Sequence, residues 1–136
     1  MTADGLTTSP SSFGPKETVE RLAAEIKARR MTVFARIDHQ AEAAAVGLTL
    51  QPTEVVIFGN AKGGTPLMQA GQTAGIDLPL RALVWQEASG KTWLSYNAPE
   101  WIAKRHGLDR ESQKTVTAMT ALLEAVAKAA TSTSEK

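Results

Sequence analysis

The stretch Ile57–Met68, IFGNAKGGTPLM, decides the fold, because its residues predict a strand that passes through a glycine-rich turn into a helix. The apolar run Val55–Phe58 is typical of a strand buried on both faces. The glycines of the turn tolerate the positive φ that a tight connection needs. Thr65 and Pro66 have the residue types of an N-cap and a first helical position, so they predict a helix that ends before Gly75.

A helix and a strand are predicted before this stretch. Within Pro15–Arg30 the apolar residues recur at helical spacing, which predicts an amphipathic helix. Met31–Ile37 changes to a period of two, as expected of a strand, with Val33, Ala35 and Ile37 on one face.

Shorter elements complete the first half of the chain. Asp38 is predicted to cap a short helix over His39–Val46, which Gly47 ends. Residues 1–14 are polar and contain proline and glycine, so they are interpreted as an N-terminal arm or as an edge strand around Gly5–Ser9.

A hairpin and a short helix are predicted after the central stretch. Leu80–Gln86 and Lys91–Tyr96 are the two arms of the hairpin. Asn97 and Glu100 have the spacing of a capping box, which predicts a short helix that ends near His106–Gly107.

The last predicted element is a long helix capped by Asp109, followed by a frayed tail over residues 131–136. Residues 15–130 are therefore predicted to form one α+β domain with two layers, an antiparallel sheet covered by helices. The buried stripe of the long helix is expected to contain Val116, Met119, Leu123, Val126 and Ala130.

Composition excludes several classes of function. The 136 residues carry a net charge of +1, from 15 Lys and Arg against 14 Asp and Glu, so neither a nucleic-acid partner nor a membrane partner is expected. The absence of cysteine excludes disulfides, thiolate metal sites and a cysteine nucleophile. No metal and no cofactor is predicted. The first residues lack the basic and apolar regions of a signal peptide, so a cytoplasmic protein is expected.

Four segments resemble a known family in their order and spacing. These are FARIDHQAEAAAVGL, PTEVVIFGNAKGGTPLMQA, LPLRALVWQ and LSYNAPEWIAKRHGL. Together they closely resemble the bacterial domain of unknown function 302 family, over roughly Val19 to Leu108. The resemblance implies a curved antiparallel sheet of the TATA-binding-protein-like class with helices on one face, and a tendency to form homodimers. It implies no established activity. Family members often have proline after the asparagine of the turn, where this chain has Ala61.

The glycine-rich turn is the first candidate site. Backbone N–H groups converge at such a turn, and the following helix start adds partial positive charge. Asn60 and Lys62 could therefore hold a phosphate, sulfate or carboxylate. The turn does not match a Walker A loop, which requires lysine directly after its second glycine. A purely structural turn is the alternative.

A second candidate is Asp38 with His39, because histidine titrates near neutral pH and an adjacent carboxylate can fix its tautomer. The alternative is that Asp38 only caps the helix and His39 is solvated. His106 lies in the last turn of its predicted helix, where a cation complements the dipole. With two histidines and no H-x-x-x-H pair, metal binding is not expected.

A third candidate is a polar and aromatic group on the hairpin and the helix that follows it. Such side chains could line a ligand cleft, form a dimer interface or belong to the core. The group contains Trp85, Trp93, Tyr96, Asn97 and Trp101.

The function predicted from these candidates is the binding of a small molecule, with an anion as the first candidate, by a homodimer without catalysis. Two alternatives are a small hydrolase or isomerase with His39 as general base, and a pure protein-interaction module. The ligand-binding residues predicted for the first hypothesis are Asp38, His39, Asn60, Lys62, Tyr96 and Asn97.

Overall fold

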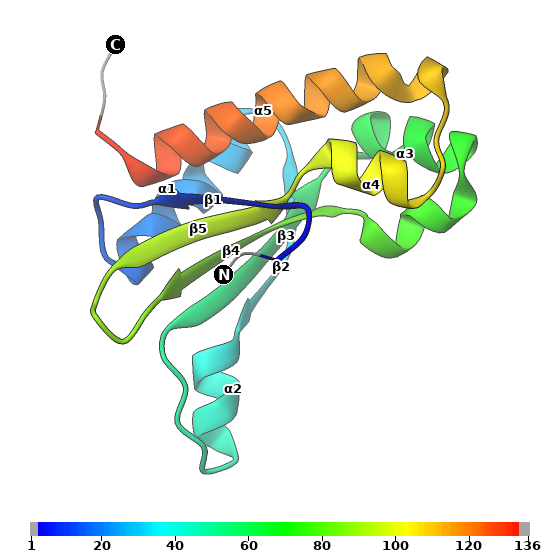
Figure 1. Cartoon of the computed structure of the whole chain (residues 1–136). Coiled ribbons are helices and arrows are strands. Elements are labelled where there is room, and N and C mark those ends of the chain that lie inside the picture. Colours follow the sequence, from blue (N-terminus) through cyan, green and yellow to red (C-terminus); the bar gives the residue numbers. More distant parts are fainter. Residues whose placement is uncertain (1–2, 134–136) are drawn as a thin grey trace.

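Five strands form one antiparallel sheet in a computed structural model that describes residues 3–133 (Figure 1). The order across the sheet is β1-β5-β4-β3-β2, so the N-terminal strand lies at one edge and the second strand lies at the other. Of the two alternatives for the N-terminal residues, an arm or an edge strand, the structure has the edge strand. The strands are β1 (Leu6–Pro10), β2 (Thr32–Asp38), β3 (Thr53–Gly59), β4 (Leu80–Gln86) and β5 (Thr92–Asn97).

Helices cover one face of the sheet, as Figure 1 shows, except for α2, which extends away from the ends of β2 and β3. None of the helices within residues 3–133 is both long enough and apolar enough to cross a lipid bilayer. The predicted α+β class with helices on one face is confirmed. The helices are α1 (Pro15–Ala28), α2 (His39–Ala45), α3 (Ala61–Ala70), α4 (Pro99–Arg105) and α5 (Gln113–Thr131), with 3-10 turns at Gln72–Asp77 and Arg110–Ser112.

The core lies between the sheet and the two long helices, α1 and α5. Pro15 begins α1 at the position where its missing N–H costs nothing, and the predicted stripe of Val19, Leu22 and Ile26 is buried. Alternate residues of the central strands meet this stripe, among them Val56 and Phe58. All five residues predicted for the buried stripe of α5 are buried.

The other face of the sheet is not covered by a helix, so β3 is not buried on both faces as predicted. Val55 and Ile57 on this open face are only partly buried. Trp85 stacks on Trp93 across the hairpin with 6.1 Å between ring centroids. The indole N–H of Trp85 also donates to Ser95 Oγ at 2.9 Å. Aromatic contacts between neighbouring strands thus replace helix packing on this side.

A β-bulge at Phe34 overturns the alternation predicted for β2. Val33 pairs with Phe58, but Ala35 already pairs with Ile57, so Phe34 is the extra residue. Residues after the bulge therefore change faces. Arg36 lies on the helix side, where it donates to Glu20 of α1 at 3.0 Å.

The start of α3 is also corrected. The helix begins at Ala61, because the Asn60 side-chain oxygen caps it by accepting the Gly63 N–H at 2.7 Å. The glycine-rich turn is thus the first helical turn, and Pro66 lies inside the helix rather than at its first position. The helix ends at Ala70, and a 3-10 turn follows.

Two predictions about element ends are wrong. Asn97 and Glu100 do not form a capping box, since α4 begins after Ala98 with Pro99 at its first position. Thr131 does not belong to a frayed tail, because it is buried in the last turn of α5 and donates to the Ala127 carbonyl at 2.8 Å. Residues 134–136 of the predicted tail lie outside the described residues.

Candidate functional site

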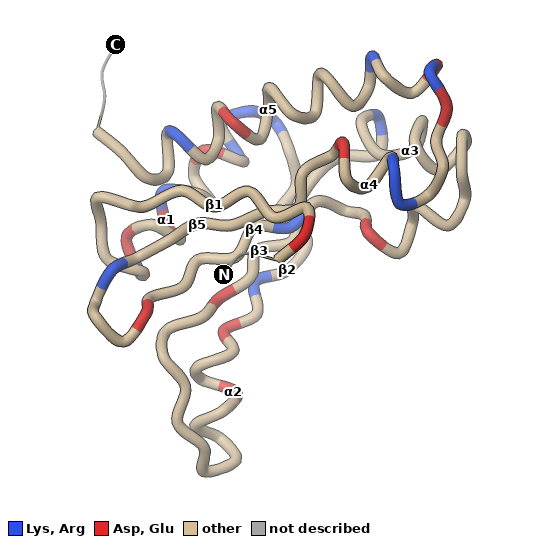
Figure 2. The backbone as a smooth tube through the Cα atoms, viewed as in Figure 1, with Lys and Arg blue, Asp and Glu red and all other residues tan. Residues whose placement is uncertain are grey.

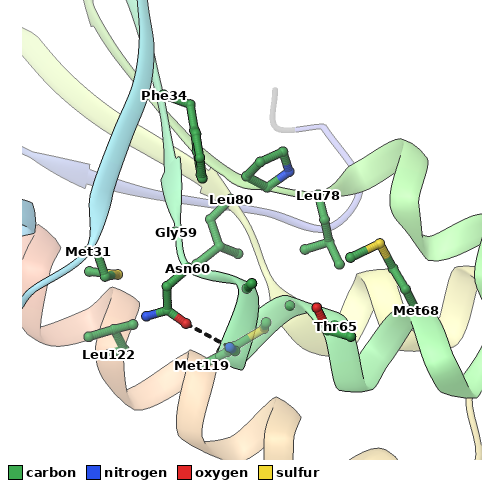
Figure 3. Close-up of a pocket in the computed structure, with 14 residues that line it drawn as sticks. Met31, Phe34, Gly59, Asn60, Thr65, Met68, Leu78, Leu80, Met119 and Leu122 are labelled. Atoms are coloured by element: carbon green, nitrogen blue, oxygen red, sulfur yellow. Dashed lines mark hydrogen bonds between the residues drawn. The ribbon is translucent and has the colours of Figure 1, made fainter.

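A cavity of about 380 Å³ opens where β2 begins, β3 ends and α3 starts. Segments far apart in the sequence form its walls, including the middle of α5 and the connection that leads into β4 (Figure 3). The residues that line it are Met31, Phe34, Gly59, Asn60, Ala61, Gly63, Gly64, Thr65, Met68, Leu78, Pro79, Leu80, Met119 and Leu122.

Methionine is the distinctive residue of this cavity. Apart from Met1, the chain has three methionines, and all three line the cavity: Met31, Met68 and Met119. None of the lining residues carries a charged side chain. Methionine is unbranched and polarisable, so its side chain adapts to the shape of a bound molecule. We call this cavity the methionine pocket.

Asn60 supplies a polar group at the edge of the methionine pocket. Because its Oδ1 accepts the Gly63 N–H, the side-chain amide is oriented with Nδ2 as the remaining donor (Figure 3). Within the described residues, Nδ2 donates no hydrogen bond to another side chain or to the backbone. Thr65 adds a hydroxyl to the same rim. The pocket therefore combines apolar walls with hydrogen-bonding groups at one side.

The structure does not bring the six predicted ligand-binding residues into one site. Asn60 lines the methionine pocket, but Lys62 is exposed and does not line it. Asp38 pairs with Glu54 at the far end of β3, a strand of seven residues that spans roughly 20 Å. Its side chain accepts the Ala41 N–H at 3.0 Å, which confirms the predicted cap.

The remaining three predicted residues also lie apart from the pocket. His39 is the exposed first residue of α2. Tyr96 and Asn97 are consecutive residues of β5, so their side chains point to opposite faces of the sheet. Tyr96 is buried under the helices, and this burial, with the nearby carboxylate of Glu124, raises the pKa of its phenol. Of the six residues, Asn60 alone lines the methionine pocket.

Two basic residues, Arg29 and Arg36, are paired with carboxylates. Arg36 contacts both Glu20 and Glu54 at 3.0 Å, and these carboxylates raise the pKa of its guanidinium. Arg29 pairs with Glu25 at 2.7 Å. Figure 2 shows acidic and basic residues interspersed along the chain, in keeping with its near-zero net charge.

Comparison with known proteins identifies the family. The chain matches the family described as "Domain of unknown function DUF302" over residues 7–126. This chain belongs to the DUF302 family. Its fold resembles the crystal structure of an uncharacterized conserved DUF302 protein from Bacillus stearothermophilus, with a TM-score of 0.83, 21% identity, and coverage of 94% of this chain and 99% of the other.

Curated relatives of this DUF302 domain are longer proteins. The chain is 50% identical over 115 residues to "Fluoride-specific ion channel FluC 1" of Brucella suis biovar 1 (strain 1330), a match that covers 85% of this chain and 45% of the relative. It is equally similar to the protein of the same description from Brucella abortus biovar 1 (strain 9-941), of which 43% is covered. The chain spans less than half the length of these relatives.

Sequence reasoning missed a polar cluster in this DUF302 domain. His106 Nε2 lies 2.6 Å from Asp77 Oδ2, and its Nδ1 lies 2.8 Å from the Thr73 hydroxyl. Arg105 donates to both oxygens of Asp77 at 2.9 Å. Because His106 and Asp77 are 29 residues apart, no local spacing reveals this contact. The cluster joins the 3-10 turn after α3 to the end of α4, and none of its members lines the methionine pocket.

The cluster is expected to stabilise the fold. Replacing His106 with alanine should lower the free energy of unfolding by about 2–3 kcal/mol, because it leaves the largely buried Asp77 carboxylate short of a hydrogen-bond donor. Urea denaturation followed by circular dichroism measures the change. The matched control is His39→Ala, since His39 is exposed and its removal should change stability by less than about 0.5 kcal/mol. If His106→Ala changes the free energy of unfolding as little as His39→Ala does, the cluster contributes nothing to stability.

Proposed function

We propose that this DUF302 domain binds a small, largely apolar molecule in the methionine pocket, without catalysis. The observation that carries the proposal is the pocket itself, whose volume of about 380 Å³ falls within the usual range for ligand sites. An apolar hollow of this size, bounded by a sheet and two helices, is suited to receive a ligand.

The apolar lining of the pocket favours a different class of ligand from the anion predicted from the sequence. An anion entering the methionine pocket would leave its water shell and meet no charged side chain there. The apolar side chains instead favour a molecule that gains free energy when its own apolar surface leaves water. The geometry does not favour the hydrolase alternative either, because His39 is exposed and lies at the opposite end of β3.

Two substitutions in the first turn of α3 test the proposal. Gly64 lines the pocket, and a Cβ added there would lie 3.9 Å from both Leu78 Cδ1 and Met68 Cε, so Gly64→Leu should fill the cavity. The neighbouring Lys62→Leu places the same leucine side chain outside the pocket and removes the charge of the turn. Binding of a panel of neutral apolar compounds and small anions should be measured by chemical shifts of methionine methyl groups.

We expect apolar compounds to bind the natural protein and Lys62→Leu with similar affinity, and Gly64→Leu at least about tenfold more weakly. If anions instead bind the natural protein and Gly64→Leu but not Lys62→Leu, the result would support the anion site predicted from the sequence. If no compound shifts the methyl signals of the natural protein, the proposed function is wrong.

A homodimer is the second part of the proposal, and the region around α2 favours it. None of the residues of α2 is buried. The connection to β3 adds three exposed apolar side chains, Val46, Leu48 and Leu50, with exposed fractions of 72%, 66% and 41%. We call residues 39–52 the α2 arm. Isolated helices this short are marginal in water, so a helix without buried residues is typical of a segment that packs on another chain.

The open face of the sheet is a suitable surface for the α2 arm of a second copy. It presents Val55, Ile57 and the Trp85–Trp93 stack without helix cover. The tip of the arm has no charged residue, as its uniform colour in Figure 2 shows. Apolar segments of both partners would leave water on association.

The ion-channel relatives suggest a setting for such a domain. Because the matched segment accounts for less than half of each relative, we propose that the channel activity in their description belongs to the remainder of those proteins. The DUF302 segment would then be a ligand-binding module joined to a channel. A cytoplasmic location for this chain stays a prediction.

A further inference from the structure

We infer that the ligand of the methionine pocket is a neutral, flat molecule of two aromatic rings with a hydrogen-bond acceptor on its edge. This inference rests on the proposed function and names its ligand class. Three features of the pocket carry it: its volume, the side chains that would contact the ring faces, and the single amide donor at its rim.

The volume sets the size of the ligand. A cavity of about 150 Å³ lined by apolar side chains holds one benzene ring. The methionine pocket has about 380 Å³, and it is open on one side rather than sealed. Two fused rings fill such a space, whereas one ring would leave much of the wall without contacts and lose dispersion energy.

Side chains with an affinity for aromatic rings line the pocket. Thioether sulfur makes favourable contacts with aromatic rings, and the pocket has three thioethers: Met31 just before β2, Met68 in α3 and Met119 in α5. Phe34 adds a ring at the mouth of the pocket (Figure 3). The Phe34 ring is 55% exposed, and a ligand ring stacked on it would cover this apolar surface.

The β-bulge explains why Phe34 has this position. In a regular strand, the residue after Val33 would point to the open face of the sheet. As the extra residue of the bulge, Phe34 instead contributes to the wall of the pocket on the other side. Bulges often re-aim side chains next to functional sites. Two separate features, the bulge and the methionines, thus favour an aromatic ligand.

The polar groups define the rest of the ligand. Asn60 Nδ2 is a donor at the rim, so the ligand should carry an acceptor on the edge that faces it. A formal charge on the ligand would lose hydration without gaining a charged partner, since no lining residue is charged. A ring nitrogen or a carbonyl oxygen satisfies both conditions.

Four probe molecules separate these requirements at pH 7.5. Quinoline has two aromatic rings and an acceptor, and naphthalene lacks the acceptor. The saturated ketone 2-decalone keeps two rings and an acceptor without aromaticity, and 2-naphthoate adds a negative charge. Titrations of protein labelled with ¹³C in the methionine methyl groups measure binding, with the signals of Met31, Met68 and Met119 assigned from Met→Leu substitutions.

Quinoline should bind most tightly and shift all three methyl signals through its ring current. We expect naphthalene to bind about fivefold more weakly, as the loss of one hydrogen bond predicts, and 2-decalone about tenfold more weakly. Asn60→Asp keeps the capping oxygen of α3 but removes the amide donor, so it should remove the advantage of quinoline over naphthalene. Phe34→Leu should weaken the binding of quinoline and leave the binding of 2-decalone unchanged.

The outcomes distinguish this inference from the proposed function. If 2-decalone binds as tightly as quinoline, the pocket binds apolar molecules but does not select aromatic ones, and the inference is overturned while the proposed function stands. Tightest binding of 2-naphthoate would overturn the neutral character of the ligand. If none of the four probes and none of the wider panel shifts a methionine methyl signal, both are wrong.

Discussion

Phe58→Ala is expected to lower the free energy of unfolding by about 3–5 kcal/mol, because it removes a fully buried ring and leaves a cavity between the sheet and the helices. Phe58 is the last large apolar residue of β3 before the turn into α3, so its loss would also loosen the wall next to the methionine pocket. Urea denaturation monitored by circular dichroism gives the difference between the variant and the natural protein.

The chain contains a matched control for this substitution. Phe34→Ala removes the same side chain from a site where 55% of it is exposed, so stability should change by less than about 1 kcal/mol. A loss at Phe34 that approaches the loss at Phe58 would mean that the bulge is an ordinary part of the core. The inference about an aromatic ligand would then lose one of its supports.

Local sequence patterns were sufficient to predict most of the helices and strands of the fold. The stripe of α1 and the stripe of α5 repeat at helical spacing over several turns, and the hairpin of β4 and β5 is bounded by a clear turn. These elements bury one continuous face each, so the sequence pattern and the tertiary packing agree. The fold class followed from the same patterns.

Errors arose where a residue far along the chain decides the local structure. The bulge at Phe34 depends on how β2 pairs with β3, and the residues of β2 alone do not determine that register. At α3 two capping signals competed. Thr65 with Pro66 has the stronger local pattern, but the Asn60 side chain reaches the Gly63 N–H and begins the helix earlier.

The candidate site was found only in part for the same reason. Asn60 was identified because a glycine-rich stretch is visible in the sequence. The methionines lie in three separate parts of the chain, just before β2, in α3 and in α5, and each alone has the pattern of a core residue. Their meeting in one cavity is a property of the tertiary structure. The contact between His106 and Asp77 is hidden in the same way.

Charged residues in the α2 arm should convert a homodimer into monomers. The variant replaces Val46, Leu48 and Leu50 with aspartate, three residues that are exposed in the single chain. Each apolar side chain buried at an interface contributes roughly 1.5–3 kcal/mol, and each dimer would contain the arm twice. We therefore expect dimer affinity to fall by at least about a thousandfold. Analytical ultracentrifugation over a range of protein concentrations measures the dissociation constant.

Thermal unfolding separates loss of association from loss of folding. Because the melting temperature of a dimer rises with protein concentration, the natural protein should show this dependence and the triple variant should not. The variant should still unfold cooperatively, since none of the three side chains packs in the core of the single chain. Ile76→Asp is the control, as Ile76 is 69% exposed but lies on the 3-10 turn after α3, so this variant should stay dimeric. A natural protein that is monomeric at high concentration would exclude the dimer. A triple variant that remains dimeric would place the interface away from the α2 arm.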